Sequence, residues 1–224
     1  MCGIIAYKGK KDASKVVLEG LKSLEYRGYD SWGIATVADS DIKVVKKVGK
    51  ISDSTNISLA SGNIGIGHTR WATHGSVTED NTHPHLDCTG KIAVVHNGII
   101  ENYQGLRKQF SSHKFVSETD TEIIAHIIED YMNQHIPFDC AVAEAVKFLK
   151  GRSAFVAVDS DSKKIVAVRK GTPLIVGVGE DEFFIASDIT AFFNHTKKVQ
   201  YLDDNELVVI DNDAEFFKAQ GGKI

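Results

Sequence analysis

Short apolar runs, broken by Gly, Asp and Ser, dominate the hydrophobic pattern of this chain. Runs of this length that end at turn-forming residues are typical of β-strands. Strands are therefore predicted at residues 2–7, 33–37, 42–48, 64–69, 91–96, 154–158, 165–168, 174–178, 183–186 and 207–210. From residue 153 onward almost every apolar run is of this kind, which indicates antiparallel meanders.

Helical periodicity is concentrated in a few places. One helix is predicted around residues 17–24, where apolar side chains recur on a single face. A second is predicted to start at Thr119, which forms a Thr-x-x-Glu capping box with Glu122, and a third spans residues 139–149. Because these helices cluster instead of alternating with strands, the pattern predicts an α+β fold with helices packed on antiparallel sheet.

Composition narrows the functional classes. The chain has 224 residues, a formal net charge of −4 and a pI of about 6.1, and a nucleic-acid-binding protein would usually carry a basic face instead. No apolar run approaches the roughly 18 residues that span a bilayer, and the N-terminus does not resemble a signal peptide. The three cysteines show no CxxC spacing, which fits reduced thiols in a cytoplasmic protein. Cys88 and Cys140 are expected to pack as small apolar residues.

Cys2 differs from the other cysteines because it becomes the first residue once Met1 is removed. An N-terminal thiol has its own α-amine nearby, and the ordinary pKa of such an amine is about 7.7–8.0, against about 8.5 for the thiol. Such a pair suits a nucleophile and its base at neutral pH. Taken alone, however, a single cysteine is a weak signal, and a strand-start residue without a chemical role is the simpler reading.

Asn97-Gly98 follows a predicted strand and has two readings. The dipeptide is a strong signal for a type I′ hairpin turn. Residues 99–110 do not alternate like a returning strand, however, and instead favour a turn into a helix. In that setting an amide side chain and an adjacent backbone N–H could together stabilise an oxyanion. The residues alone leave both readings open.

Charged and imidazole side chains add two further hypotheses. Arg70 ends a predicted strand, and its guanidinium could hold a substrate carboxylate by two hydrogen bonds, while Asp120 could pair with an α-amino group. A surface arginine and a carboxylate placed on a helix dipole are the simpler alternatives. Histidines at 68, 74, 83 and 85 suggest a metal, but their spacing matches no usual site, so no metal is predicted.

The combination of these segments resembles the class II glutamine amidotransferases, whose glutaminase domains are N-terminal-nucleophile hydrolases. The likeness covers essentially the whole chain and is nearest to the glutaminase domains of the glucosamine-6-phosphate synthases. Six segments carry it in order: Met1-Cys2-Gly3-Ile4, residues 26–31 (YRGYDS), residues 68–75 (HTRWATHG), His83-Pro84-His85, residues 96–102 (HNGIIEN) and residues 117–122 (SETDTE).

The resemblance implies a four-layer αββα sandwich and a role for each matching residue. Catalysis would fall to Cys2 as the nucleophile, with its α-amine as the base, and to the oxyanion hole of Asn97 and Gly98. Arg70 would bind the α-carboxylate of glutamine, with Thr73 and His74 beside it. Asp120 would bind the α-amino group, and Trp71 would lie on a loop that closes over glutamine. Arg27 would order the site near the nucleophile, and no cofactor is implied.

The implied reaction is hydrolysis of the side-chain amide of L-glutamine through a cysteine thioester, which yields glutamate and ammonia. In the resembled synthases, that ammonia converts fructose 6-phosphate to glucosamine 6-phosphate in a C-terminal sugar-phosphate isomerase half. Residues 1–220 are expected to form the glutaminase domain and residues 221–224 to begin a linker to that half, which this sequence does not contain. A homodimer through that half fits the resemblance, whereas a membrane or nucleic-acid partner does not. Two alternatives remain: the glutaminase half of another class II amidotransferase, and a non-catalytic glutamine-sensing module.

Overall fold

Two antiparallel sheets form the centre of the computed structural model, which describes residues 2–54, 57–73, 75–219 and 222. In spatial order, the first sheet consists of β11 (Val199–Tyr201), β9 (Ile175–Val178), β10 (Phe183–Ala186), β1 (Gly3–Lys8), β4 (Ile64–Arg70), β2 (Ser31–Ala38) and β3 (Asp41–Val48). The second sheet consists of β13 (Ala214–Lys218), β12 (Glu206–Ile210), β8 (Ile165–Lys170), β7 (Ser153–Asp159), β6 (Ile92–Gly98) and β5 (His85–Leu86).

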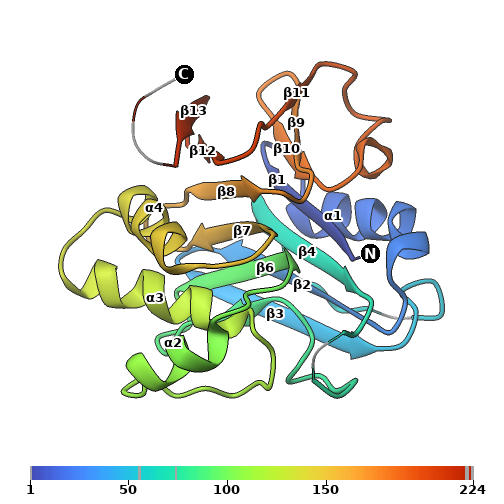
Figure 1. Ribbon diagram of the computed structural model, residues 1–224. Coiled ribbons are helices and arrows are strands. Elements are labelled where there is room, and N and C mark those ends of the chain that lie inside the picture. The colour runs from blue at the N-terminus through green and yellow to red at the C-terminus, as the bar shows by residue number, and fades with distance from the viewer. Residues whose placement is uncertain (1, 55–56, 74, 220–221, 223–224) are drawn as a thin grey trace.

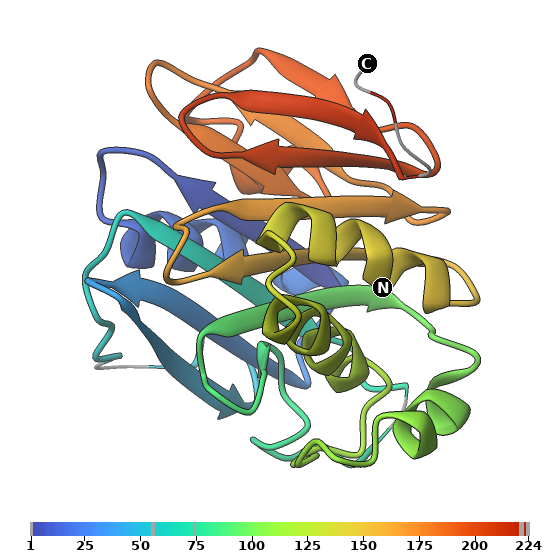
Figure 2. The same cartoon turned by 90° about the vertical axis from the view of Figure 1, so that its left-hand side faces the viewer.

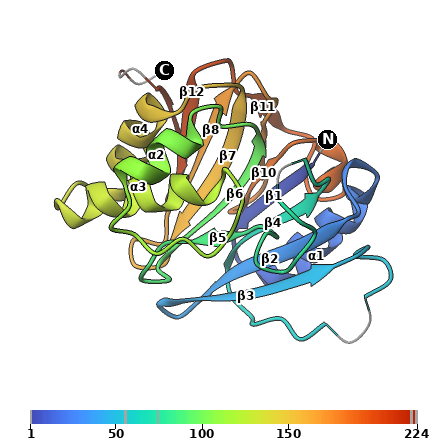
Figure 3. The same cartoon turned by 60° about the horizontal axis from the view of Figure 1, so that its bottom comes forward.

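Helices cover the outer face of each sheet. Helix α1 (Ala13–Ser23) lies on the first sheet, and the second sheet is covered from the other side by α2 (Tyr103–Gln109), α3 (Glu122–Asn133) and α4 (Phe138–Phe148). Figure 3 shows α2, α3 and α4 on one side of the strands and α1 on the opposite side. The order of layers is therefore helix, sheet, sheet, helix, which confirms the predicted α+β fold with four αββα layers.

Three apolar cores follow from this layering. The middle core joins the facing sides of the two sheets and contains residues such as Ile4, Ile66 and Val95, all fully buried. Strands β1, β4 and β7 are buried almost along their whole length, because each has a sheet or a helix on both faces. That double burial explains why β1 and β7 contain continuous apolar runs instead of alternating patterns. Figures 1 and 2 show the sheets from two sides.

Helix α1 approaches β4 closely because the facing strand carries glycines. A Cβ atom at Gly67 would lie 2.5 Å from a side-chain carbon of Val17 on α1, a distance that real Cβ atoms essentially never show. Strand β3, by contrast, lies at the edge of its sheet and has no buried residue, with lysines along it. Charged edge strands of this kind oppose pairing with a second chain.

The structure differs from the sequence prediction in several local features. Strands β5 and β11 were not predicted, since they are only 2 and 3 residues long, and neither was β13 at the sheet edge. The predicted capping box is wrong: α3 starts at Glu122 with Thr121 at its N-cap position, and no side chain caps it. The Glu122 carboxylate instead accepts hydrogen bonds from the backbone of Val116 and Ser117.

No helix in the described part of the chain combines the length and apolar character needed to cross a membrane.

Candidate active site

Cys2 stands directly before β1, where two strand pairings fix its surroundings. Gly3 pairs with Thr69 of β4, and Arg70 at the end of β4 pairs with Ser31 of β2. The chain leaves β4 at Trp71, so the backbone of this residue lies against the thiol. The N–H of Trp71 donates to Cys2 Sγ at 3.2 Å, and the carbonyl of Trp71 lies 3.5 Å from the sulfur.

The backbone carbonyl of Cys2 accepts two hydrogen bonds from opposite sides. Arg27 Nε donates at 3.1 Å, and Asn97 Nδ2 donates at 3.0 Å. Arg27 follows α1 in a short 3-10 turn and also forms an ion pair with Asp188 at 3.6 Å. Asn97 comes from β6, in the other sheet. The nucleophile candidate is therefore fixed where the two sheets meet.

The orientation of the Asn97 amide is set by His68. The Nε2 atom of His68 lies 3.0 Å from the carbonyl of His96 and 3.1 Å from Asn97 Oδ1. Both partners are acceptors, so Nε2 carries the ring proton and donates to them. Burial lowers the pKa of His68 to about 3, so the ring is neutral at physiological pH. Because Oδ1 accepts from His68, the NH₂ group of Asn97 faces Cys2.

Gly98 ends β6 in a conformation that suits glycine. Its φ is 127°, and a Cβ at this position would lie 2.1 Å from the carbonyl oxygen of Arg152. Gly98 pairs with Ser153 of β7, and the chain then runs on into α2. The hairpin reading of Asn97-Gly98 is therefore wrong, and the reading as a turn into a helix is confirmed.

Arg70 and Asp120 are both buried and line the same hollow as Cys2. The guanidinium of Arg70 donates to the carbonyl of Ser76 at 3.0 Å and to that of Gly75 at 3.3 Å. Asp120 accepts from the backbone N–H of Ile100 at 2.7 Å, just after the Asn97-Gly98 pair. One cation and one carboxylate thus lie on the same side of the thiol, as an amino-acid zwitterion would require.

Two hollows meet at Cys2. The inner one is lined by Cys2, Arg70, Trp71, Thr73, His83, His96, Gly98, Thr119, Asp120 and Thr121. The outer one is lined by Cys2, Arg27, Trp71, Thr73, Asn97, Gly98, Ile99 and Thr172. Trp71 borders both and is 47% exposed, with its ring 5.6 Å from that of Tyr29. Of the predicted site residues, only His74 lies outside the described residues; the others line at least one of these hollows.

The loop after β4 is fixed by hydrogen bonds to residues for which the sequence predicted no role. Asp30 accepts from the N–H of Ala72 at 2.9 Å, and the Glu118 carboxylate accepts from the backbone and hydroxyl of Ser76 at 3.1 and 3.0 Å. Asn81 donates to Glu118 at 2.9 Å. Asp30 and Glu118 both lie within the motifs that carry the family resemblance, so a signal for them was present. The fold was needed to reveal what they bind.

The remaining histidines of the site are hydrogen-bonded within the protein. The backbone N–H of His96 donates to His83 Nδ1 at 3.2 Å. The imidazole of His96 bonds to the Thr121 hydroxyl at 2.9 Å, and that of His85 bonds to the Thr119 hydroxyl at 3.0 Å. Burial lowers the pKa of all three imidazoles. Among the described residues, these rings do not form a group that could hold a metal ion.

The chemistry of the thiol depends on this environment. Burial raises the pKa of the Cys2 thiol, and the Trp71 N–H together with the Arg70 and Arg27 cations oppose that rise only partly. A thiol with a raised pKa is mostly protonated at neutral pH, so attack on a substrate requires a base. No imidazole of the described residues hydrogen-bonds the sulfur.

Comparison with known proteins identifies the family of this chain. Residues 68–194 match the glutamine amidotransferase domain. The chain belongs to this family. It is 50% identical to the glutamine–fructose-6-phosphate aminotransferase (isomerizing) of Methanothermobacter thermautotrophicus and 49% identical to that of Pyrococcus horikoshii. These alignments cover 100% and 95% of this chain but only 39% and 37% of the relatives, so the chain spans well under half of their length.

Solved structures agree on the fold of this amidotransferase domain. A glutamine phosphoribosylpyrophosphate amidotransferase from B. subtilis, in complex with ADP and GMP, superposes with a TM-score of 0.84 at 24% identity. A second structure, of an allosteric regulatory enzyme of purine biosynthesis, gives 0.86 at 25% identity. Each match covers 97% of this chain and 49% of the other.

Proposed function

We propose that this domain hydrolyses the side-chain amide of L-glutamine, with the thiol of Cys2 as the nucleophile. The observation that carries the proposal is the shared hollow of Cys2, Arg70 and Asp120, which places a thiol beside one buried cation and one buried carboxylate. The family membership supports the same reaction.

The proposed reaction proceeds through a thioester. After removal of Met1, the α-amine of Cys2 takes the thiol proton, and the sulfur attacks the amide carbon of glutamine. The carbonyl oxygen becomes an oxyanion, which accepts hydrogen bonds from Asn97 Nδ2 and the Gly98 N–H. When the oxyanion collapses, the carbon–nitrogen bond breaks, and the ammonium form of the α-amine protonates the departing ammonia. Water then attacks the thioester, gives its proton to the amine, and releases glutamate with the thiol restored.

Substrate binding would use the charges beside the thiol. Arg70 would hold the α-carboxylate by two hydrogen bonds, with Thr73 and His74 as further substrate-binding residues, and Asp120 would bind the α-amino group. The exposed indole of Trp71 would close over bound glutamine, and Arg27 would keep Cys2 in place through its carbonyl. Exclusion of water by such closure would strengthen every electrostatic contact in the hollow.

The lengths of the relatives suggest the wider role. We infer that residues 1–220 form a glutaminase domain and that ammonia passes to a sugar-phosphate isomerase half, where fructose 6-phosphate becomes glucosamine 6-phosphate. The name and the extra length of the relatives at 50% identity support this role over other class II amidotransferases. A homodimer through the second half and a cytoplasmic location belong to the same proposal.

The test compares protein processed to Cys2 with protein that carries an uncleavable extension before Cys2. An extension turns the α-amine into an amide, which cannot accept a proton, whereas the thiol remains. Only the processed form should release glutamate from glutamine, with both masses verified. Equal activity of the intact extended form would show that the α-amine is not the base and would favour a histidine of residues 68–85. Glutamine binding without hydrolysis by the processed form would instead indicate a sensing module.

A further inference from the structure

A second thiol, far from Cys2 in the sequence, lies within a group of metal-binding side chains. Cys88 follows β5, His113 follows α2, and His126 and Glu129 stand on α3, one turn apart. One ligand atom from each of these residues lies within 4.8 Å of the others. Of the four, the sequence analysis noted only Cys88, although His126-x-x-Glu129 places two metal-binding side chains on one helix face.

Four of the six distances between the ligand atoms of this group lie close to the edges of a tetrahedral site. Zinc bonds of about 2.3 Å to sulfur and about 2.0–2.1 Å to nitrogen or oxygen separate sulfur from nitrogen by about 3.6 Å and nitrogen from oxygen by about 3.3 Å. Cys88 Sγ lies 3.6 Å from His113 Nδ1 and 3.7 Å from His126 Nδ1. Glu129 Oε2 lies 2.9 and 3.2 Å from the same two nitrogens.

The other nitrogen of each ring faces a carboxylate. His126 Nε2 lies 3.7 Å from Glu122 Oε1, and His113 Nε2 lies 3.8 Å from Asp130 Oδ1. His126 Nε2 is buried and makes no hydrogen bond. Imidazoles that bind a metal usually donate their second N–H to a carboxylate or carbonyl, which fixes the ring tautomer. Both histidines are thus positioned for metal binding through Nδ1.

Without a cation, the same atoms form a crowded hydrogen-bond network. Glu129 Oε2 accepts from both imidazole Nδ1 atoms and from the backbone N–H of Cys88, the last at 3.0 Å. A divalent cation would take the place of both Nδ1 protons, so that each ring becomes the Nε2–H tautomer. It would also displace the thiol proton. The positive ion would then offset the repulsion between the thiolate and the carboxylate.

We propose that Cys88, His113, His126 and Glu129 bind one zinc ion as a closed, four-coordinate structural site. One thiolate, two imidazoles and one carboxylate form a donor set that suits zinc, whereas magnesium and calcium prefer oxygen ligands. Four protein ligands leave no open position for a substrate, which separates this site from the chemistry at Cys2. The ion would join α3 to the turn after β5 and to the segment after α2.

Solvent can reach this site. A cleft beside Cys88 is lined by Asp80, Asp87, Glu122, Lys46 and Lys114, in which carboxylates outnumber lysines. Cys88 itself is exposed, whereas Glu129 and His126 are buried beneath it. A cation can therefore enter from the cleft and meet the buried ligands last.

The test uses untagged full-length chain that carries Cys2→Ala, because an N-terminal thiol and amine could also chelate zinc. After incubation with zinc and removal of weakly bound ion, we expect about one zinc ion per chain by elemental mass spectrometry. Co²⁺ in the same protein should give a thiolate-to-metal absorption band. Added Cys88→Ser should abolish this band and most of the bound zinc.

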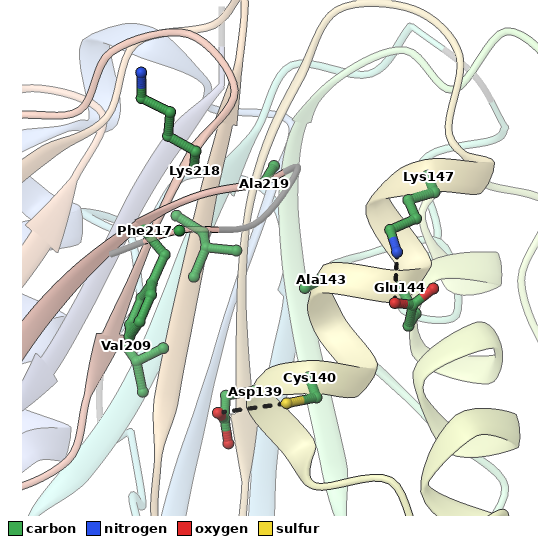
Figure 4. Close-up of a pocket in the computed structure, with 11 residues that line it drawn as sticks. Asp139, Cys140, Ala143, Glu144, Lys147, Val209, Phe217, Lys218 and Ala219 are labelled. Atoms are coloured by element: carbon green, nitrogen blue, oxygen red, sulfur yellow. Dashed lines mark hydrogen bonds and ion pairs between the residues drawn. The ribbon is translucent and has the colours of Figure 1, made fainter. Parts of the chain in front are cut away.

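The matched control is Cys140→Ala in the same background. Cys140 is the other exposed cysteine and lies on α4 in a groove that faces β12 and β13, next to Asp139 (Figure 4). This control should keep both zinc and the cobalt band. Asp130→Asn leaves the four ligands intact and should weaken zinc binding about tenfold through His113. Retention of less than a small fraction of one zinc per chain, or a cobalt band unchanged by Cys88→Ser, would overturn the proposal.

Discussion

Cys2 and Cys88 are two thiols of one chain with opposite surroundings. Among the described residues, the sulfur of Cys2 hydrogen-bonds to backbone groups of Trp71, while the nearby imidazoles bond to backbone groups, to the Asn97 amide or to hydroxyl groups. The sulfur of Cys88 has two imidazole nitrogens within 3.7 Å and a carboxylate behind them. A thiol near cationic side chains and amide N–H donors suits nucleophilic attack. A thiol beside imidazole and carboxylate ligands suits binding of a metal cation.

The difference shows that residue type alone does not decide the chemistry of a cysteine. Cationic side chains and N–H donors face Cys2: Arg27, Arg70 and the Asn97 amide. Potential metal ligands face Cys88: the Glu129 carboxylate and two imidazole Nδ1 atoms, which can bind a cation only after they lose their protons. The first arrangement stabilises negative charge that develops during a reaction, and the second stabilises a bound positive charge.

The largest predicted effect separates the two thiols by activity. Cys2→Ala should abolish glutamate release, because no other described thiol lies in the hollow with Arg70 and Asp120. Cys88→Ala and Cys140→Ala should keep most of the rate at moderate temperature. The measurement is glutamate formed from glutamine by each purified variant after circular dichroism has verified its fold. Turnover by Cys2→Ala near the unmodified rate would remove Cys2 from the mechanism.

The next effect tests the donor side of the Cys2 environment. Asn97→Ala should lower kcat by about 10²–10³-fold with little change in KM, because its amide would stabilise charge that forms only in the transition state. His68→Leu should show part of the same pattern, since the amide would lose the N–H that orients it. His68→Gln, which can place an amide N–H near the former Nε2, should recover much of the loss. A rise confined to KM in Asn97→Ala would indicate ground-state binding or a purely structural role.

The sequence predicted much of this fold and part of the site for identifiable reasons. Strand β7, for example, is buried on both faces, so its continuous apolar run revealed it. Asn97-Gly98 stayed ambiguous because a local signal for a hairpin competes with pairing to a distant strand, which only the fold reveals. The exposure of Cys88 and Cys140 contradicts their predicted packing role, since apolar character does not say which face a side chain occupies. The group around Cys88 combines three separate segments and could not be assembled from spacing.

A smaller effect is expected at the two ends of the substrate. Arg70→Lys keeps the charge but loses the planar pair of donors, and a lost charged hydrogen bond of about 1.5–3 kcal/mol corresponds to roughly 10–150-fold weaker glutamine binding. Asp120→Asn should weaken glutamine binding as well, and a glutamine analogue without its α-amine should not distinguish this variant from the unmodified protein. Binding is measured by calorimetry in the Cys2→Ala background. Normal glutamine binding by both variants would contradict the assignment.

The effect that is smallest at neutral pH concerns acid stability, and it again separates the two regions. Burial lowers the folded-state pKa of His68 from 6.5 to about 3, so between these values the unfolded chain binds a proton that the folded protein does not. The free energy of unfolding is therefore not reduced by His68 above pH 6.5. Below pH 6.5, this residue lowers it by about 1.4 kcal/mol per pH unit toward pH 3. His68→Gln should flatten the decline of the urea midpoint across this range. His135→Asn is the matched control, because His135 is exposed at φ 63°, a conformation that asparagine adopts readily, and it should leave the slope unchanged. If His68→Gln and His135→Asn give the same slope, the buried imidazole on the Cys2 side is not a source of acid sensitivity.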